Sequence, residues 1–140
     1  MDYEQQIILP NDVAAISRLA EFINRVCEAA GVDEGFTMQL NLAAEEAVVN
    51  VMNYAYPPGT KGDIEVSSRI AGNTVTLVIR DSGVPFDPTA KADADTTLTV
   101  EERPIGGLGI YLVRRMMDSI AYERTADGKN VLTMKKEVSS

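Results

Sequence analysis

The amino-acid sequence predicts a two-layer α/β (α+β) sandwich, in which a mixed, mostly antiparallel sheet is covered on one face by about three helices. Two observations lead to this class. The first is that apolar residues recur at helical spacing in some segments and alternate with polar residues in others. The second is the order of these segments: a strand, two helices, a hairpin, a long polar stretch, a third helix and a final hairpin.

Turn residues separate the expected elements. We expect strands at residues 3–9, 64–70, 75–79, 120–124 and 130–137, and helices at residues 13–30, 33–54 and 105–117. Asn11 or Asp12 can cap the first helix, and Gly31 ends it. Pro57 and Pro58 stop the second helix, because proline cannot continue a helical hydrogen-bond ladder.

The chain is expected to form one domain, residues 1–140, because its length and its apolar fraction of 45% fit a single core. The stretch from about Pro85 to Pro104 has little apolar content and many Asp, Thr and Ala residues. A loop of this length inside a compact domain is usually a functional lid or disordered.

Composition narrows the function classes. The net charge of −8 argues against direct nucleic-acid binding, which needs a basic face. The absence of histidine excludes His general bases, His metal ligands and a phosphoaccepting His in this chain. No apolar run suits a membrane helix, residues 1–10 lack a secretory pattern, and the single cysteine, Cys27, fits a reducing compartment. We therefore expect a cytoplasmic protein with no membrane partner.

The second expected helix carries a polar stripe. At about 100° per residue, Glu46, Asn50 and Asn53 lie within about 60° of one another, and Gln39 falls on the same stripe. Most of the remaining surface of this helix is apolar, so the helix should be largely buried. Asn50 can offer its side-chain oxygen to Mg²⁺, and Glu46 can orient a hydroxyl or take its proton, which suits phosphoryl transfer. The alternative is the solvated side of an amphipathic helix.

The segment Asp81-Ser82-Gly83 ends an apolar strand. A carboxylate at this place can accept a hydrogen bond from an exocyclic amine such as that of adenine, while Gly83 lets a ring approach the backbone. Because Asp, Ser and Gly also form ordinary turns, a plain turn is the alternative.

The third expected helix opens with Gly106-Gly107-Leu108-Gly109. Glycines at a helix start let exposed N–H groups contact phosphate. This is not a Walker A loop, because no Gly-Lys-Ser/Thr follows, and it lacks the third glycine of the dinucleotide fingerprint. A flexible hinge before a helix is the alternative.

Taken together, the three motifs resemble the Bergerat-fold (GHKL) ATPases, and most closely the bacterial anti-sigma factor serine/threonine kinases of the partner-switching type. The motifs are Glu46-x-x-x-Asn50, Asp81-x-Gly83-x-x-Phe86-Asp87-Pro88 and Gly106-Gly107-x-Gly109-Ile110. The resemblance covers roughly residues 8–137, and residues 109–118 and 128–135 are especially similar to that subfamily.

The resemblance implies a role for each of these residues. Glu46 would be the catalytic base and Asn50 the Mg²⁺ ligand, with Asn53 lining the nucleotide pocket. Asp81 would bind the adenine amine, and Thr133 would support adenine, usually through water. The other residues implied to bind the nucleotide are Gly83, Phe86, Arg103, Gly106, Gly107, Leu108 and Gly109, and residues 87–105 would form the ATP lid.

One departure from the family pattern concerns Arg103. Some relatives carry an arginine directly before the glycine pair, where it can reach the γ-phosphate. In this chain Ile105 holds that position and Arg103 lies a little further back, so the role of Arg103 stays open. Val84-Pro85 replaces a second glycine that is common in histidine kinases, which favours the anti-sigma branch.

The resemblance implies an ATP- and Mg²⁺-dependent kinase that phosphorylates a serine or threonine of a STAS-type anti-sigma factor antagonist and binds a sigma factor or an equivalent regulator. A homodimer is also allowed, because family members often pair through the first-helix region. The alternative is a protein-binding switch that uses nucleotide without phosphotransfer, but a pure binder would not need Glu46. A self-contained histidine kinase is disfavoured, because the chain has no His and no room for a phosphoacceptor hairpin.

Overall fold

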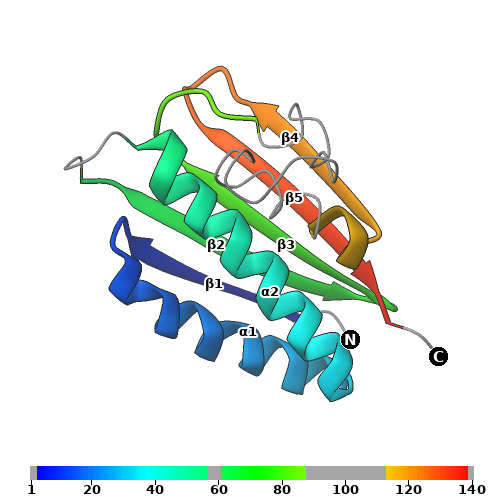
Figure 1. The fold of residues 1–140 in the computed structure, drawn as a ribbon. Coiled ribbons are helices and arrows are strands. Elements are labelled where there is room, and N and C mark those ends of the chain that lie inside the picture. The colour runs from blue at the N-terminus through cyan, green and yellow to red at the C-terminus, as the bar shows by residue number, and fades with distance from the viewer. Residues whose placement is uncertain (1–2, 57–60, 88–112, 139–140) are drawn as a thin grey trace, which may run out of the picture.

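The computed structural model of the chain describes residues 3–56, 61–87 and 113–138, which form two layers (Figure 1). One layer is a five-stranded sheet with the strand order β1-β2-β3-β5-β4. The other contains α1 (Ile16–Ala30) and α2 (Glu34–Asn50), which lie across one face of this sheet, together with a short helical segment at residues 113–116. The predicted fold class is confirmed, although each pair of described strands is antiparallel rather than mixed.

All five expected strands are present, with ends that differ from the predicted ones by at most two residues. They are β1 (Tyr3–Pro10), β2 (Asp63–Ala71), β3 (Thr74–Asp81), β4 (Ser119–Arg124) and β5 (Asn130–Glu137). Two hairpin turns depend on glycine: Gly72 has φ 59° and Gly128 has φ 86°, a left-handed conformation that side chains with a Cβ rarely adopt.

The first helix begins and ends as its capping residues predict. The Oδ1 of Asp12 accepts a hydrogen bond from the backbone N of Ala14 at 2.9 Å, which opens the 3₁₀ turn η1 (Val13–Ala15) before α1. Gly31 ends α1 with φ 69°. The buried residues of α1 follow helical spacing and pack into the core; they are Leu19, Phe22, Ile23, Val26 and Cys27.

The second helix differs from the prediction in its last turn. The Oδ1 of Asp33 accepts a hydrogen bond from the backbone N of Phe36 at 2.8 Å and caps α2. The α-helix ends at Asn50 rather than near residue 54, and the chain continues as one π-helical turn, η2 (Val51–Ala55). Because a π-turn is wider than an α-turn, residues beyond Asn50 no longer follow the 100° spacing that the sequence analysis assumed.

The core lies between the sheet and the helices, and strand alternation decides which side chains enter it. On β3 the residues Val75, Leu77, Ile79 and Asp81 are buried, while the residues between them are partly exposed. Burying a large aliphatic side chain stabilises the fold by about 1.5–3 kcal/mol. Asp81 therefore stands at the end of a row that is otherwise apolar.

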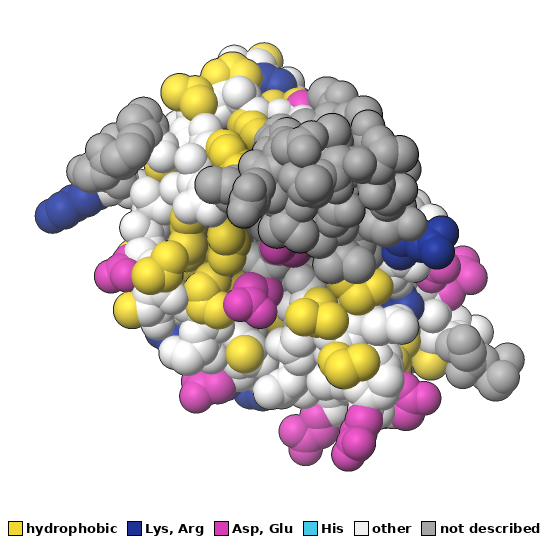
Figure 2. Space-filling view, in the orientation of Figure 1, with side chains coloured by type: hydrophobic (Ala, Val, Ile, Leu, Met, Phe, Trp, Pro, Cys, Tyr) yellow, Lys and Arg dark blue, Asp and Glu magenta, His cyan; other side chains and the backbone are white. Residues whose placement is uncertain are grey.

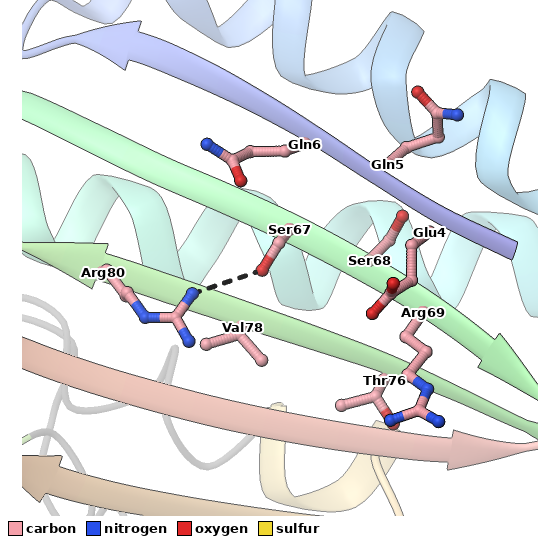
Figure 3. Close-up of a pocket in the computed structure, with 9 residues that line it drawn as sticks. All are labelled: Glu4, Gln5, Gln6, Ser67, Ser68, Arg69, Thr76, Val78 and Arg80. Carbon is pink, nitrogen blue, oxygen red and sulfur yellow. Dashed lines mark hydrogen bonds between the residues drawn. The ribbon is translucent and has the colours of Figure 1, made fainter.

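The other face of the sheet carries no helix in the described part of the chain, and it has a shallow hollow of about 570 Å³ (Figure 3). Polar side chains from β1, β2 and β3 line this hollow, among them Gln6, Ser67, Arg69 and Arg80. The Nη1 of Arg80 donates to Ser67 Oγ at 3.5 Å. We call this side of the sheet the open face.

Within the described ranges, no helix has the length and hydrophobicity that crossing a membrane requires.

Candidate functional site

Most of the buried polar side chains gather at one end of the fold. In the described part of the chain they are Asn50, Ser68, Asp81 and Asn130. Asn50 is the last residue of α2, Asp81 the last of β3 and Asn130 the first of β5, where it pairs directly with Asp81. The backbone N of Val84 donates to the carbonyl of Ala55 at 2.7 Å. This bond joins the end of η2 to the loop that follows Asp81.

Asp81 is 4% exposed and uses one carboxylate oxygen for two hydrogen bonds. The Nδ2 of Asn130 and the backbone N of Gly83 both donate to its Oδ1 at 2.9 Å. Among the described residues none donates to Oδ2, so one acceptor oxygen remains for a donor from elsewhere. Burial raises the pKa of Asp81, and the bonds from Asn130 and Gly83 and the charge of Arg124 oppose this increase.

Asn130 is the centre of the hydrogen-bond network around Asp81. Besides its bond to Asp81, its Nδ2 donates to the carbonyl of Val84 at 2.8 Å. Its Oδ1 accepts from the backbone N of Phe86 at 3.2 Å, the hydroxyl of Tyr122 at 2.5 Å and the Nη1 of Arg124 at 3.3 Å. Every donor meets an acceptor, so the orientation of the Asn130 amide is determined by its neighbours.

Gly83 is required by the close packing of backbone. A Cβ at this position would lie 2.3 Å from the carbonyl oxygen of Ala55, which is far closer than real contacts of a Cβ. From the sequence, Gly83 was expected to let a ring approach the backbone. The structure gives another reason, because the end of η2 occupies the space where a Cβ would point.

Aromatic side chains hold the loop after β3 against η2. The rings of Tyr54 and Phe86 are stacked, with centroids 5.0 Å apart and an interplanar angle of 18°. The hydroxyl of Tyr56 donates to the carbonyl of Asp63 at 2.8 Å and accepts from the backbone N of Ser82 at 2.9 Å. The loop that follows Asp81 is therefore held in place at Ser82, by Tyr56, and at Phe86, by Tyr54.

The end of α2 supplies a carboxylate and an amide one turn apart. Asn50 is 4% exposed, and no described residue hydrogen-bonds to its side chain, which is unusual for a buried amide. Glu46 is partly buried, and burial is the main cause that raises its pKa, followed by the charge of Glu45. A raised pKa makes a carboxylate a better proton acceptor near neutral pH.

A family profile described as "Histidine kinase-like ATPase domain" matches residues 9–136, which is most of the chain. The chain belongs to this family of histidine kinase-like ATPase domains.

Two named relatives agree with this membership. The serine/threonine-protein kinase BtrW of Bordetella bronchiseptica is 34% identical over 95 residues, which are 68% of this chain and 66% of that protein. A serine-protein kinase RsbW of Oceanobacillus iheyensis is 26% identical over 125 residues, which are 85% of this chain and 77% of that protein. The resemblance to the partner-switching kinases is confirmed.

A solved structure shares the fold. The crystal structure of the RsbU and RsbW domains of Rv1364c from Mycobacterium tuberculosis matches with a TM-score of 0.70 at 16% identity. The match covers 99% of this chain but 33% of that chain. This chain thus spans just under two thirds of BtrW and one third of the Rv1364c chain.

The residues present fit the nucleotide and metal that a histidine kinase-like ATPase domain implies. The Oδ2 of Asp81 is an acceptor suited to an amine, and Asn50 offers a buried amide oxygen. The described residues contain no cluster of three or more His, Cys, Asp or Glu that could hold a metal. A Mg²⁺ ion at Asn50 would therefore take its other ligands from phosphates and water, as this ion commonly does.

The distribution of charged side chains on the helix-covered face is consistent with a nucleotide that binds together with Mg²⁺. Figure 2 shows acidic side chains in the middle and along the lower edge of this face, and Lys and Arg mostly toward its periphery.

The structure places several predicted site residues away from the buried network or leaves them outside the described ranges. Asn53 lies on the π-helical turn η2 and is exposed. The predicted residues that lie outside the described residues are Arg103, Gly106, Gly107, Leu108 and Gly109, together with all of the expected lid after Asp87. Phe86 lies close to the network, since its backbone N donates to Asn130.

The structure places Thr133 on the opposite face of the sheet from Asp81. Thr133 pairs with Val78 in the β3–β5 register, and residues of this parity lie on the open face. Asp81 has the opposite parity and faces the helices, so the two side chains point away from each other across the sheet. Asn130, three residues earlier, is the β5 residue beside Asp81, and the sequence analysis missed it. Its position directly after the turn at Gly128 was the available signal.

Proposed function

We propose that this chain binds Mg²⁺-ATP and transfers the γ-phosphate to a serine or threonine hydroxyl of a protein partner. The observation that supports the proposal most is that two buried polar side chains at one end of the fold keep hydrogen-bonding capacity for a ligand. One carboxylate oxygen of Asp81 and the buried side-chain amide of Asn50 each lack a hydrogen-bond partner among the described residues. The bond between Val84 and Ala55 links the segments that carry them.

In this proposal Asp81 recognises the base. Its Oδ2 accepts a hydrogen bond from the exocyclic amine of adenine, and the two donors to Oδ1 keep the carboxylate oriented. The stacked rings of Tyr54 and Phe86 fix the loop that follows, so the carboxylate is already placed before the nucleotide binds.

Glu46 and Asn50 serve the other end of the nucleotide. Glu46 accepts the proton of the attacking serine or threonine hydroxyl. The oxygen of that hydroxyl bonds to the γ-phosphorus while the bond from the γ-phosphorus to the β–γ bridging oxygen breaks, which yields ADP and a phosphoprotein. Asn50 contributes one oxygen ligand to Mg²⁺, which neutralises phosphate charge when bound. Burial raises the pKa of Glu46, which suits this role as a base.

The resemblance to the partner-switching kinases suggests the protein partners. We propose a STAS-type anti-sigma factor antagonist as the phosphorylated partner and a sigma factor, or an equivalent regulator, as the bound partner. The support is that the named relatives BtrW and RsbW are serine kinases.

The test has two stages. Calorimetry with ATP should show affinity that rises with Mg²⁺ in the wild-type chain and loses its Mg²⁺ dependence in Asn50→Ala. Proteins captured on the chain from the native cell are then incubated with ATP labelled at the γ-phosphate, with Glu46→Ala as the control. Label on a serine or threonine with the wild type alone supports the kinase. Binding of ATP and capture of a partner without label would instead favour a nucleotide-dependent binding switch.

A further inference from the structure

Arg124, on the edge strand β4, is a basic residue that hydrogen-bonds to the network around Asp81 although it belongs to none of the predicted motifs. The Nη1 of Arg124 lies 2.9 Å from the carbonyl oxygen of Gly83 and 3.3 Å from the Oδ1 of Asn130. Gly83 and Asn130 are the two residues that donate to the Oδ1 of Asp81. Arg124 therefore contacts both groups that determine how Asp81 is held.

Tyr122, two residues earlier on β4, acts on the same amide. Its hydroxyl donates to the Oδ1 of Asn130 at 2.5 Å. Donors at this oxygen oblige the other end of the amide, Nδ2, to face Asp81 and the carbonyl of Val84. Were the amide reversed, its oxygen would meet two acceptors and its NH₂ would meet three donors. The pair on β4 thus keeps an N–H donor directed at Asp81.

This arrangement has a consequence for the base that Asp81 can accept. A carboxylate oxygen has about two lone-pair sites, and both sites of Oδ1 are used by Gly83 and Asn130. No donor from the described ranges reaches Oδ2, so this oxygen remains for a ligand. Adenine presents one exocyclic amine and needs one acceptor, whereas guanine presents two adjacent donors, at N1 and N2, that match both oxygens of a free carboxylate.

We propose that Arg124 and Tyr122 are positioning residues that make the site select adenine over guanine by keeping the Oδ1 of Asp81 occupied through Asn130 and Gly83. The inference rests on the proposed nucleotide site and adds the origin of its base specificity. Neither residue touches the nucleotide in this account, since both act through Asn130 and the loop at Gly83.

The experiment measures ATP and GTP affinity by calorimetry at one Mg²⁺ concentration. Arg124→Met keeps the length of the side chain and removes its donors, Arg124→Lys retains a cationic donor, and Tyr122→Phe removes only a hydroxyl. The control is Lys135→Met, which removes one positive charge from the open face of the neighbouring strand β5.

We expect the preference for ATP over GTP to fall about tenfold in Arg124→Met. This variant loses the hydrogen bonds of Arg124 to Gly83 and Asn130, and the loss of such bonds typically changes a binding constant by about this factor. Arg124→Lys should restore part of the preference, Tyr122→Phe should lower it about threefold, and Lys135→Met should leave it unchanged. A merely structural role would weaken ATP and GTP by the same factor, and that result would overturn the inference.

Two further outcomes separate this inference from the proposed function. If the wild-type chain binds ATP and GTP equally, the adenine site itself is wrong and the inference fails with it. If the wild type prefers ATP and both Arg124→Met and Tyr122→Phe keep that preference, only the inference is wrong. The midpoint of thermal unfolding is measured for each variant, and Tyr122→Phe decides the question if Arg124→Met does not fold.

Discussion

The two faces of the sheet use polar side chains in opposite ways. On the helix-covered face Asp81 and Asn130 are each 4% exposed and are held by short hydrogen bonds to one another and to the adjacent loop. On the open face Glu65 and Arg80 form a salt bridge at 3.3 Å, and both side chains are about one third exposed. The residues alternate along the same strand, so a single step from Arg80 to Asp81 separates a solvated pair from a buried network.

This contrast indicates where function is to be expected. Removing a carboxylate from water is unfavourable unless it is hydrogen-bonded, and a protein keeps such a group for structural specificity or for a ligand. A salt bridge in solvent contributes little, because water screens both charges. Substitutions in the buried network should therefore have larger effects than matched substitutions at exposed positions.

The largest expected effect is on catalysis. Glu46→Ala should lower phosphate transfer to the partner by about 10²- to 10⁴-fold, the range for loss of a general base, while ATP affinity is kept. Glu28→Ala is the control, because Glu28 is an exposed carboxylate on α1 and does not contribute to the raised pKa of Glu46. Initial rates of transfer from γ-labelled ATP measure both variants. Equal rates in Glu46→Ala and wild type would remove Glu46 from the role of base.

The next effect concerns recognition of the base. Asp81→Asn should weaken ATP binding by about ten- to a hundredfold, because an acceptor oxygen with a charge is replaced by a neutral amide. Glu65→Gln on the open face is the control and should bind ATP as the wild type does. Calorimetric titration with Mg²⁺-ATP compares the two. If Asp81→Asn retained wild-type affinity, the base would have to bind elsewhere.

A smaller effect is expected on stability. Gly83→Ala should lower the free energy of unfolding by about 1–3 kcal/mol, because the new Cβ would be 2.3 Å from the carbonyl oxygen of Ala55. Gly35→Ala should not be destabilising, since a Cβ there meets only Asp33 Oδ1 at 3.5 Å and alanine favours helices. Urea denaturation measures both. Equal stability of Gly83→Ala and wild type would mean that η2 and the loop can separate freely.

The smallest effect should come from the open face. Arg80→Gln removes the salt bridge with Glu65 and should change the free energy of unfolding by less than about 1 kcal/mol, as is usual for exposed pairs. Its ATP affinity should equal that of the wild type. Urea denaturation measures the stability and calorimetry the affinity. A large loss of ATP affinity in Arg80→Gln would show that the two faces of the sheet are coupled.

The sequence by itself determined the strands, the two long helices and the place of Asp81 at the end of a buried strand. Alternating and helical apolar spacing predicted all five strands and both long helices, because these patterns record which side chains enter the core. The cap at Asp12 and the helix end at Gly31 could be predicted for the same reason, since they depend on neighbouring residues. Asp81 was found because a carboxylate at the end of an apolar strand stands out in the sequence.

The tertiary structure decided which residues meet. Asn130 joins Asp81, and Thr133 does not, because the register of β3 with β5 places them on different faces, and register follows from long-range pairing that no local pattern contains. The contacts of Arg124 with Gly83, and of Gly83 with Ala55, likewise link segments far apart in the chain. The π-helical turn at Val51–Ala55, whose last residue accepts a hydrogen bond from Val84, was likewise not expected from the local apolar spacing.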